Sequence, residues 1–202
     1  MKVVIAGFGE FLEFKHNTSK EILKNIKARK DLIKLILPVG YFKNDFIAPI
    51  VKYSPEIYLI LGMWNGDYCK IETLAKNEML TLKNPLLRCI VNLYSNLLKL
   101  KGKNLLIKKP ISQDKLTIIK IDKDSQGSIR LHDKPPKISG IKKSEDAENF
   151  VCNYAMWVIE KYIRMHRAKT RFYFLHLPQK MTKKQELSVY DFIESIYRNK
   201  LN

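Results

Sequence analysis

The sequence predicts an α/β fold in which helices cover both faces of one sheet. Apolar runs of strand type alternate with segments of helical spacing over roughly the first sixty residues, a pattern typical of consecutive β-α-β units. The run Ile57–Leu61 is almost continuously apolar, as expected for a strand that is covered on both faces. The chain has 202 residues, of which 46% are hydrophobic, and this suffices for one domain with a large core.

Turn and capping residues divide the first part of the chain into five elements. Gly7 ends the first strand, Pro38 ends the second, and Ser19 is a suitable N-cap for the first helix. In chain order we expect a strand at 3–6, a helix from Ser19 to about Arg29, a strand within 31–39, a helix over 42–53 that contains Pro49, and a strand at 57–61. Residues 62–68 then form a loop at the carboxyl end of a strand, where open α/β sheets place ligand sites.

The second part of the chain predicts helices, strands and one long surface loop. In chain order we expect a helix that begins at Asn84-Pro85, strands at 105–107 and 116–119 that could form a hairpin around 110–114, a surface loop over 122–139, a helix after Asn149, a strand over 171–178 and a helix from Thr182 to about Asn199. Thr182 and Gln185 fit a capping box at the start of the last helix, which would bury Leu187 on its apolar face.

Lysine and arginine outnumber the acidic residues by 37 to 20, which leaves a formal net charge of +17. Such a charge favours attraction to nucleic acid, anionic lipid or acidic ligands. The basic residues are spread along the whole chain, however, and the sequence lacks the motifs of common nucleic-acid-binding modules. A solubilising surface accounts for the charge equally well, so the charge alone does not decide between the two interpretations.

The cysteines predict neither a disulfide framework nor a zinc site. Cys69, Cys89 and Cys152 are an odd number without CxxC spacing, and the loop after the first strand lacks the GxGxxG fingerprint of dinucleotide-binding folds. The residues therefore predict neither a cysteine-based zinc site nor a dinucleotide cofactor. The N-terminus has no signal-peptide pattern and no apolar run is long enough to span a bilayer, which predicts a cytoplasmic location.

One cysteine and one histidine stand where a catalytic pair could form. Cys152 lies in the first turn of a strongly amphipathic helix with Asn149 as its N-cap, and unpaired backbone N–H groups there should lower the pKa of the thiol. His176 ends a strand that Pro178 terminates, so its imidazole could take the thiol proton. The alternative is that Cys152 is an inert core residue, as most buried cysteines are. Glu72, taken alone, is most simply a solvated carboxylate.

Four stretches resemble, in the same order, segments of the pyroglutamyl peptidase type I (pyrrolidone-carboxylate peptidase) family of cysteine peptidases. They are Lys2–Phe11, similar to the opening strand and its Gly-Phe-x-x-Phe loop; Leu37–Val39, similar to the end of the second strand; Leu61–Glu72, similar to the glycine-containing loop and catalytic glutamate; and Asp146–Tyr154 with His176–Pro178, similar to the nucleophile and histidine segments. The most specific part is Cys-Asn-Tyr followed by a strand that closes on His-x-Pro. The resemblance covers about 1–76 and 144–180.

The resemblance implies a fold, a triad and a substrate. The fold is a three-layer α/β/α sandwich with a twisted mixed sheet, of the phosphorylase/hydrolase type, forming a single domain over 1–202 with a divergent middle segment at about 77–143. The implied triad is Cys152, His176 and Glu72, with His176 as the base and Glu72 fixing its tautomer. The implied activity is removal of an N-terminal pyroglutamate (5-oxoproline) from peptides, without metal or cofactor. The implied lactam pocket is lined by Phe8, Phe11, Phe150 and Val151.

The chain departs from the family pattern in two places, just before Cys152 and in the loop before Glu72. Glu148-Asn149 replaces the usual Gly-Thr before the nucleophile, and a glutamate there should raise the pKa of the thiol. The loop before Glu72 is one residue short and carries Asp67 near a position where the family has an arginine. The sequence thus favours a cysteine peptidase, and the family includes homo-oligomers. The alternative is a catalytically inactive relative that binds an anionic partner such as nucleic acid.

Overall fold

A central six-stranded sheet organises the part of the chain described by the computed structural model, which covers residues 2–10, 16–84, 115–125 and 127–198. The strand order is β2-β1-β3-β10-β4-β9. Its strands are β1 (Val3–Phe8), β2 (Leu32–Leu37), β3 (Ile57–Trp64), β4 (Cys69–Glu72), β9 (Ile141–Ser144) and β10 (Arg171–Pro178). All neighbouring pairs are parallel except β10 and β4, which run antiparallel. The sheet is therefore mixed, as expected.

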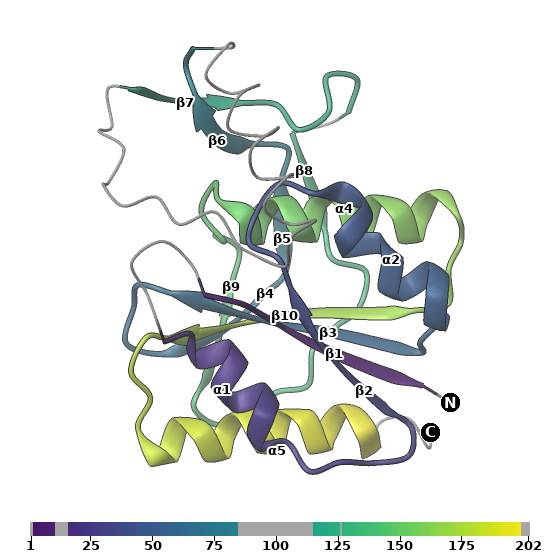
Figure 1. The fold of residues 1–202 in the computed structure, drawn as a ribbon, viewed down its shortest axis with the longest axis vertical. Coiled ribbons are helices and arrows are strands. Elements are labelled where there is room, and N and C mark those ends of the chain that lie inside the picture. Colours follow the sequence, from purple (N-terminus) through teal and green to yellow (C-terminus); the bar gives the residue numbers. More distant parts are fainter. Residues whose placement is uncertain (1, 11–15, 85–114, 126, 199–202) are drawn as a thin grey trace.

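Helices cover both faces of this sheet, and Figure 1 shows the three layers. They are α1 (Thr18–Asn25), α2 (Lys43–Tyr53), α4 (Val151–Met165) and α5 (Lys183–Arg198). Alternate side chains of a strand point to opposite faces, and β1 follows this rule: Val4 and Ala6 pack in the cluster with α2 and α4, while Val3 and Ile5 pack in the cluster with α1 and α5. The predicted α/β/α sandwich is confirmed.

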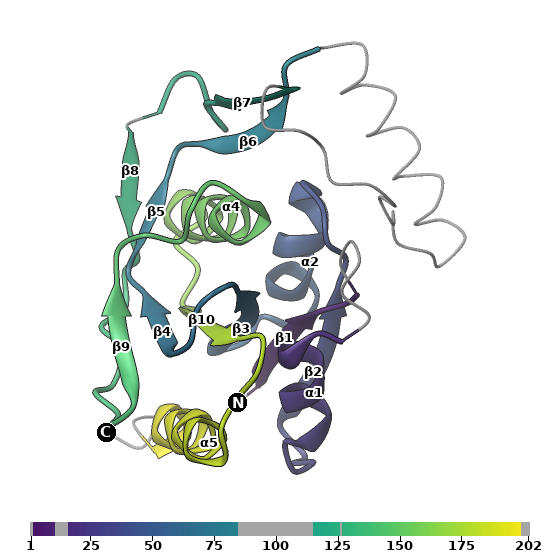
Figure 2. The same cartoon turned by 90° about the vertical axis from the view of Figure 1, so that its left-hand side faces the viewer.

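Two short two-stranded sheets lie outside the central sheet, on the side of α4 (Figure 2). One pairs β5 (Leu74–Lys76) with β8 (Ser128–Arg130), and the other pairs β6 (Met79–Leu82) with β7 (Leu116–Ile119). The predicted strand at 116–119 is confirmed, but its partner is β6. The loop predicted over 122–139 contains β8. The helix predicted after Asn84 and the strand predicted at 105–107 fall in 85–114, outside the described residues.

Two helices begin or end at residues other than those predicted from the sequence. The N-cap of α1 is Asn17, whose Oδ1 accepts from the backbone N–H of Ser19 at 3.1 Å, so the prediction of Ser19 as the cap is wrong; the helix also ends at Asn25. The prediction of Asn149 as the N-cap of α4 is wrong as well. The carbonyl of Asn149 accepts from Leu80 N in β6 at 2.6 Å, and Phe150 caps the helix without a side-chain hydrogen bond.

The C-terminal helix α5 begins as predicted but buries a different set of residues. The N–H of Gln185 donates to Thr182 Oγ1, and the N–H of Thr182 donates to Gln185 Oε1, which confirms the capping box. Leu187 is 55% exposed, so its predicted place on the buried face is wrong. Among the described residues, no helix combines the length and the apolar character needed to cross a membrane.

Candidate active site

Strand register brings three ionisable side chains together on one face of the sheet. His176 of β10 pairs with Lys70 of β4, and Phe174 pairs with Glu72, in an antiparallel register. Residues two apart on a strand share a face, and Phe174 packs in the cluster with α4. His176, Lys70 and Glu72 therefore all face α4. On the other side of β10, the register places His176 beside Gly62 of β3.

The imidazole of His176 is hydrogen-bonded to the carboxylate of Glu72, with 2.7 Å between Nδ1 and Glu72 Oε1. Both residues are buried. Burial opposes ionisation of Glu72, but the hydrogen bond and the charge of His176, then a hydrogen bond with Ser144 and last the charge of Lys70, together outweigh it and hold the pKa of the carboxyl below its ordinary value. Burial likewise lowers the pKa of His176. A neutral imidazole that faces an ionised carboxylate carries its proton on Nδ1, which leaves the Nε2 lone pair free to accept a proton.

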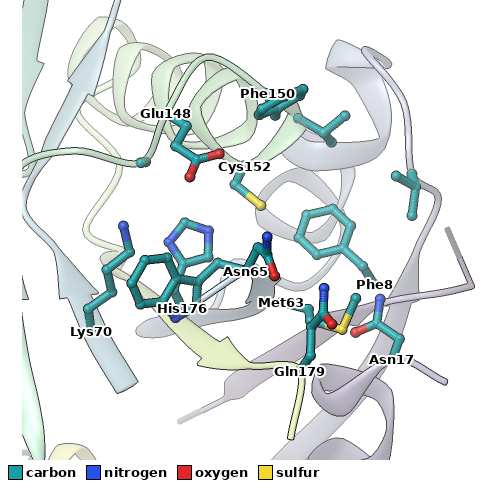
Figure 3. A pocket seen from close by; sticks show the side chains of 14 residues that line it. Phe8, Asn17, Met63, Asn65, Lys70, Glu148, Phe150, Cys152, His176 and Gln179 are labelled. Carbon is teal, nitrogen blue, oxygen red and sulfur yellow. The ribbon is translucent and has the colours of Figure 1, made fainter. Parts of the chain in front are cut away.

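Cys152 is the second residue of α4 and lines the same cavity as His176 (Figure 3). Burial, followed by the negative charges of Glu72 and Glu148, raises the pKa of its thiol to about 12, although Lys70 acts in the opposite direction. The expectation that the helix N-terminus lowers this pKa is therefore wrong, because desolvation and two carboxylates outweigh the helix dipole. The expected effect of Glu148 has the right sign. Without substrate, an uncharged thiol lies beside an uncharged imidazole.

The side chain of Asn153 fixes the start of α4 against the neighbouring segment. It is fully buried and makes three hydrogen bonds: Oδ1 accepts from Lys76 N at 2.8 Å, and Nδ2 donates to the carbonyls of Lys76 at 2.9 Å and Glu78 at 2.7 Å. Lys76 follows Glu72 by only four residues along the chain. The asparagine after Cys152 thus ties the thiol-bearing helix to the segment that carries the glutamate.

The cavity around Cys152 and His176 has a volume of about 600 Å³ and a mostly apolar lining. Among the residues expected to bind substrate, Phe8, Phe150 and Val151 line it. Phe8 is almost buried and packs edge-on against Phe46, with a ring distance of 6.2 Å, whereas Phe150 is 47% exposed. Phe11, the other expected pocket residue, lies outside the described residues. A mostly apolar lining with a few polar groups is typical of small-molecule sites.

Gly62 leaves room for the imidazole. A Cβ atom at this position would lie 2.8 Å from Cε1 of Phe174 and 3.1 Å from Cδ2 of His176. Both distances are shorter than ordinary carbon–carbon contacts, so a larger residue would displace the rings. The prediction that Gly62 begins a loop is wrong, because β3 continues to Trp64 and the loop starts at Asn65. Gly62 belongs to the wall behind His176.

Several residues that line this cavity were not predicted from the sequence. Lys70 lies beside His176, and Asn17 lies near Phe8 (Figure 3). The ring centre of Trp64 lies 6.5 Å from that of His176. Glu148, expected only as a charge near the thiol, lines the cavity from a backbone conformation with φ of 58°, which L-residues adopt at a cost. Lys70 could have been found from its spacing, because it precedes Glu72 by two residues and so shares its face in any strand.

The chain was compared with known protein families, curated sequences and solved structures. No protein-family model and no curated protein sequence matches the chain. Solved structures do match. Pyrrolidone carboxyl peptidase from the hyperthermophile Pyrococcus furiosus aligns over 100% of both chains with a TM-score of 0.70 at 17% identity, and a point mutant of the same enzyme gives 0.69. The enzyme from Thermococcus litoralis aligns over 91% of this chain and 78% of its own, with a TM-score of 0.60 at 19% identity.

The chain has the pyrrolidone carboxyl peptidase fold. This confirms the fold that the sequence resemblance implied. Within the described residues, no group of three or more His, Cys, Asp or Glu side chains is arranged to hold a metal ion.

Proposed function

We propose that the protein is a cysteine peptidase that removes N-terminal pyroglutamate from peptides. The observation that carries the proposal is that His176 lines one cavity with Cys152 while its imidazole is hydrogen-bonded to the buried carboxylate of Glu72. The fold adds support, because the solved structures that share it are pyrrolidone carboxyl peptidases. The proposed catalytic residues are Cys152, His176 and Glu72.

In the proposed reaction His176 acts first as a base and then as an acid. Nε2 accepts the thiol proton while the sulfur of Cys152 attacks the carbonyl carbon of the pyroglutamyl residue, forming the carbon–sulfur bond. The imidazolium then gives its proton to the leaving amine as the carbon–nitrogen bond breaks, which leaves a thioester. Water, deprotonated by His176, then attacks the thioester carbon. The carbon–sulfur bond breaks, pyroglutamate leaves, and the imidazolium returns its proton to the sulfur of Cys152. Glu72 stabilises the imidazolium that forms in each half of the reaction.

The start of α4 and the cavity wall supply the remaining interactions. The backbone N–H of Cys152 is one of the first four of the helix and has no intrahelical partner, so it can donate to the oxyanion of the intermediate. Phe8, Phe150 and Val151 would pack against the flat lactam ring, and Phe11 is proposed as a further wall. A neutral ring suits a mostly apolar pocket.

The test is hydrolysis of a fluorogenic pyroglutamyl amide by the wild-type chain and by the Cys152→Ser and His176→Gln variants. The matched control is Cys69→Ser, which removes a buried thiol on β4 that does not line the cavity. Turnover that survives in Cys69→Ser and is lost in the other two supports the proposal. A prolyl amide, which lacks the lactam oxygen, should not be cleaved. Absence of turnover in a folded wild-type preparation would overturn the proposal.

The alternative of an inactive binding module is not favoured, because the solved structures that share the fold are peptidases. We also propose one domain over 1–202 whose divergent middle segment spans about 77–143. A homo-oligomeric state, a cytoplasmic location and a nucleic-acid partner stay predictions of the sequence.

A further inference from the structure

Lys70 is a buried cation in the wall of the candidate site. Its side chain is 6% exposed, and its Nζ lies 3.1 Å from Oε1 of Glu72. The same nitrogen donates to the carbonyl of Asp146 at 2.7 Å and lies 4.2 Å from the centre of the Trp64 ring. A lysine is almost never buried to this degree without partners. The partners here include the carboxylate that holds His176.

The described contacts of Lys70 are all with side chains and backbone of the protein itself. An ammonium group has three N–H bonds, and Lys70 has three partners: a carboxylate oxygen, a carbonyl oxygen and an aromatic face. Two of these partners are fixed by the fold. Asp146 contributes its backbone carbonyl, and the Trp64 ring is held in place because its Nε1–H donates to the carbonyl of Tyr68 at 2.9 Å. The third is shared, because Oε1 of Glu72 contacts both Lys70 and His176.

We propose that Lys70 is a positioning residue of this site, which holds Glu72 through the oxygen that also bonds the imidazole and keeps His176 uncharged until substrate binds. The positioning role follows from the contacts of Lys70, whereas its effect on catalysis rests on the proposed function. Lys70 acts on the pair in two ways. It restrains the carboxylate that orients the Nδ1–H of His176, and its charge opposes protonation of the imidazole.

Charged groups from two segments act on His176, and they differ in sign. On β4, Glu72 favours the imidazolium and Lys70 opposes it; from the segment before α4, Glu148 favours it. Asp146 of the latter segment is paired with Lys76 at 2.8 Å. Among the described residues, Lys70 is thus the cation that contacts the carboxylate of Glu72 directly. Removing it should raise the pKa of His176, and the protonated imidazole cannot accept the thiol proton.

The experiment compares Lys70→Met with wild type by two readouts. NMR titration of the imidazole gives the pKa of His176, with His176→Gln assigning its signal among the four histidines. The fall of kcat/KM at low pH gives the pKa of the same imidazole from the kinetics. We expect both to move to higher pH by about one unit, which is a tenfold loss of kcat/KM on the acid side. Methionine retains the apolar length of the lysine side chain, so the wall remains filled.

Three further variants separate positioning from packing. Lys142→Met is the matched control, because Lys142 lies on the neighbouring strand β9, is exposed and stacks on Tyr68 at 4.1 Å; it should shift neither readout. Lys70→Arg keeps the charge and should restore the wild-type pKa. In a Glu72→Gln background Lys70→Met should no longer act through the shared carboxylate, so only the direct effect of the lost charge on the pKa of His176 should remain. Thermal unfolding checks that each variant is folded, and Lys70→Gln replaces Lys70→Met if the latter is not.

The outcomes distinguish this inference from the proposed function. A shift of the NMR titration in Lys70→Met supports the inference even if no pyroglutamyl amide is cleaved, and only the proposed function then fails. Folded Lys70→Met protein whose His176 titrates as in wild type would overturn the inference, whether or not the enzyme is active. If Lys70→Met loses activity but the pKa from the fall of kcat/KM at low pH does not change, Lys70 has only a packing role, and the inference is overturned.

Discussion

The thiol of Cys152 should react slowly when no substrate is bound. Its surroundings raise the thiol pKa from an ordinary 9.0 to about 12. At pH 8 the thiolate then makes up about 0.01% of the thiol instead of about 10%. A more basic thiolate is a better nucleophile, and a Brønsted slope of about 0.4–0.5 recovers about twentyfold for three pKa units. The net expectation is a reaction about fiftyfold slower than that of an unperturbed thiol.

The perturbation that tests this reasoning is Glu148→Gln. It removes one of the two carboxylates that raise the thiol pKa, and each unit by which the pKa falls should accelerate the reaction about three- to fourfold. The assay is the rate of reaction with a small neutral disulfide such as dithiodipyridine against pH, in a Cys69→Ser, Cys89→Ser background. Glu145→Gln is the control, because Glu145 lies in the same segment but pairs with Arg130 at 2.6 Å.

Two results would refute this account of the thiol. The first is a wild-type Cys152 that reacts faster than a cysteine in an unstructured peptide, with a rate that has already levelled off at neutral pH. That behaviour would mean that a thiolate–imidazolium pair exists before substrate arrives. The second is an identical pH dependence in Glu148→Gln and wild type, which would mean that water screens the carboxylate from the sulfur.

Three further substitutions test the geometry of the site. Glu72→Gln should lower kcat/KM by about 10²–10⁴-fold with little change in KM, because the amide has no charge to stabilise the imidazolium and its N–H₂ group can hold the imidazole in the wrong tautomer; steady-state kinetics would show it, and near-wild-type kcat would contradict it. Gly62→Ala should cost about 1–3 kcal/mol of stability and reduce kcat, since its Cβ would meet the rings of Phe174 and His176; urea unfolding and kinetics measure the two effects. Asn153→Ala should cost about 2–4 kcal/mol through three lost hydrogen bonds, and an unchanged urea midpoint would refute that role.

Local patterns were sufficient to predict four strands of the central sheet, β1, β2, β3 and β10, but they missed β4 and β9. They also singled out Cys152 and His176, which line one cavity. The strands β1, β3 and β10 are buried on both faces, so their sequences are continuous apolar runs that differ from the spaced apolar residues of α4. A proline ends β10 two residues after His176, and a helix begins just before Cys152. Each of these signals is contained in a few neighbouring residues. The chain therefore specifies them without reference to the rest of the fold.

The errors share one cause, which is that tertiary contacts override local preference. Asn149 is a better N-cap than phenylalanine by intrinsic preference, but its carbonyl is bound by Leu80 in β6, and the helix begins one residue later. The pairing of β7 with β6 instead of a nearer strand is of the same kind. The role of Lys70 depends on the antiparallel register of β4 against β10, which no local pattern encodes.

The electrostatics of the site follow from burial more than from the helix dipole. A helix N-terminus contributes roughly half a positive charge, whereas the thiol of Cys152 is partly desolvated and is acted on by the carboxylates of Glu72 and Glu148. Desolvation penalises every charged form, so both the thiolate and the imidazolium are disfavoured before substrate binds. Proton transfer and carbon–sulfur bond formation must then occur together, because a free thiolate is too scarce to attack first. In such a site the groups that fix the imidazole matter more than those that acidify the thiol, and this is why Glu72 and the lysine behind it should control the rate.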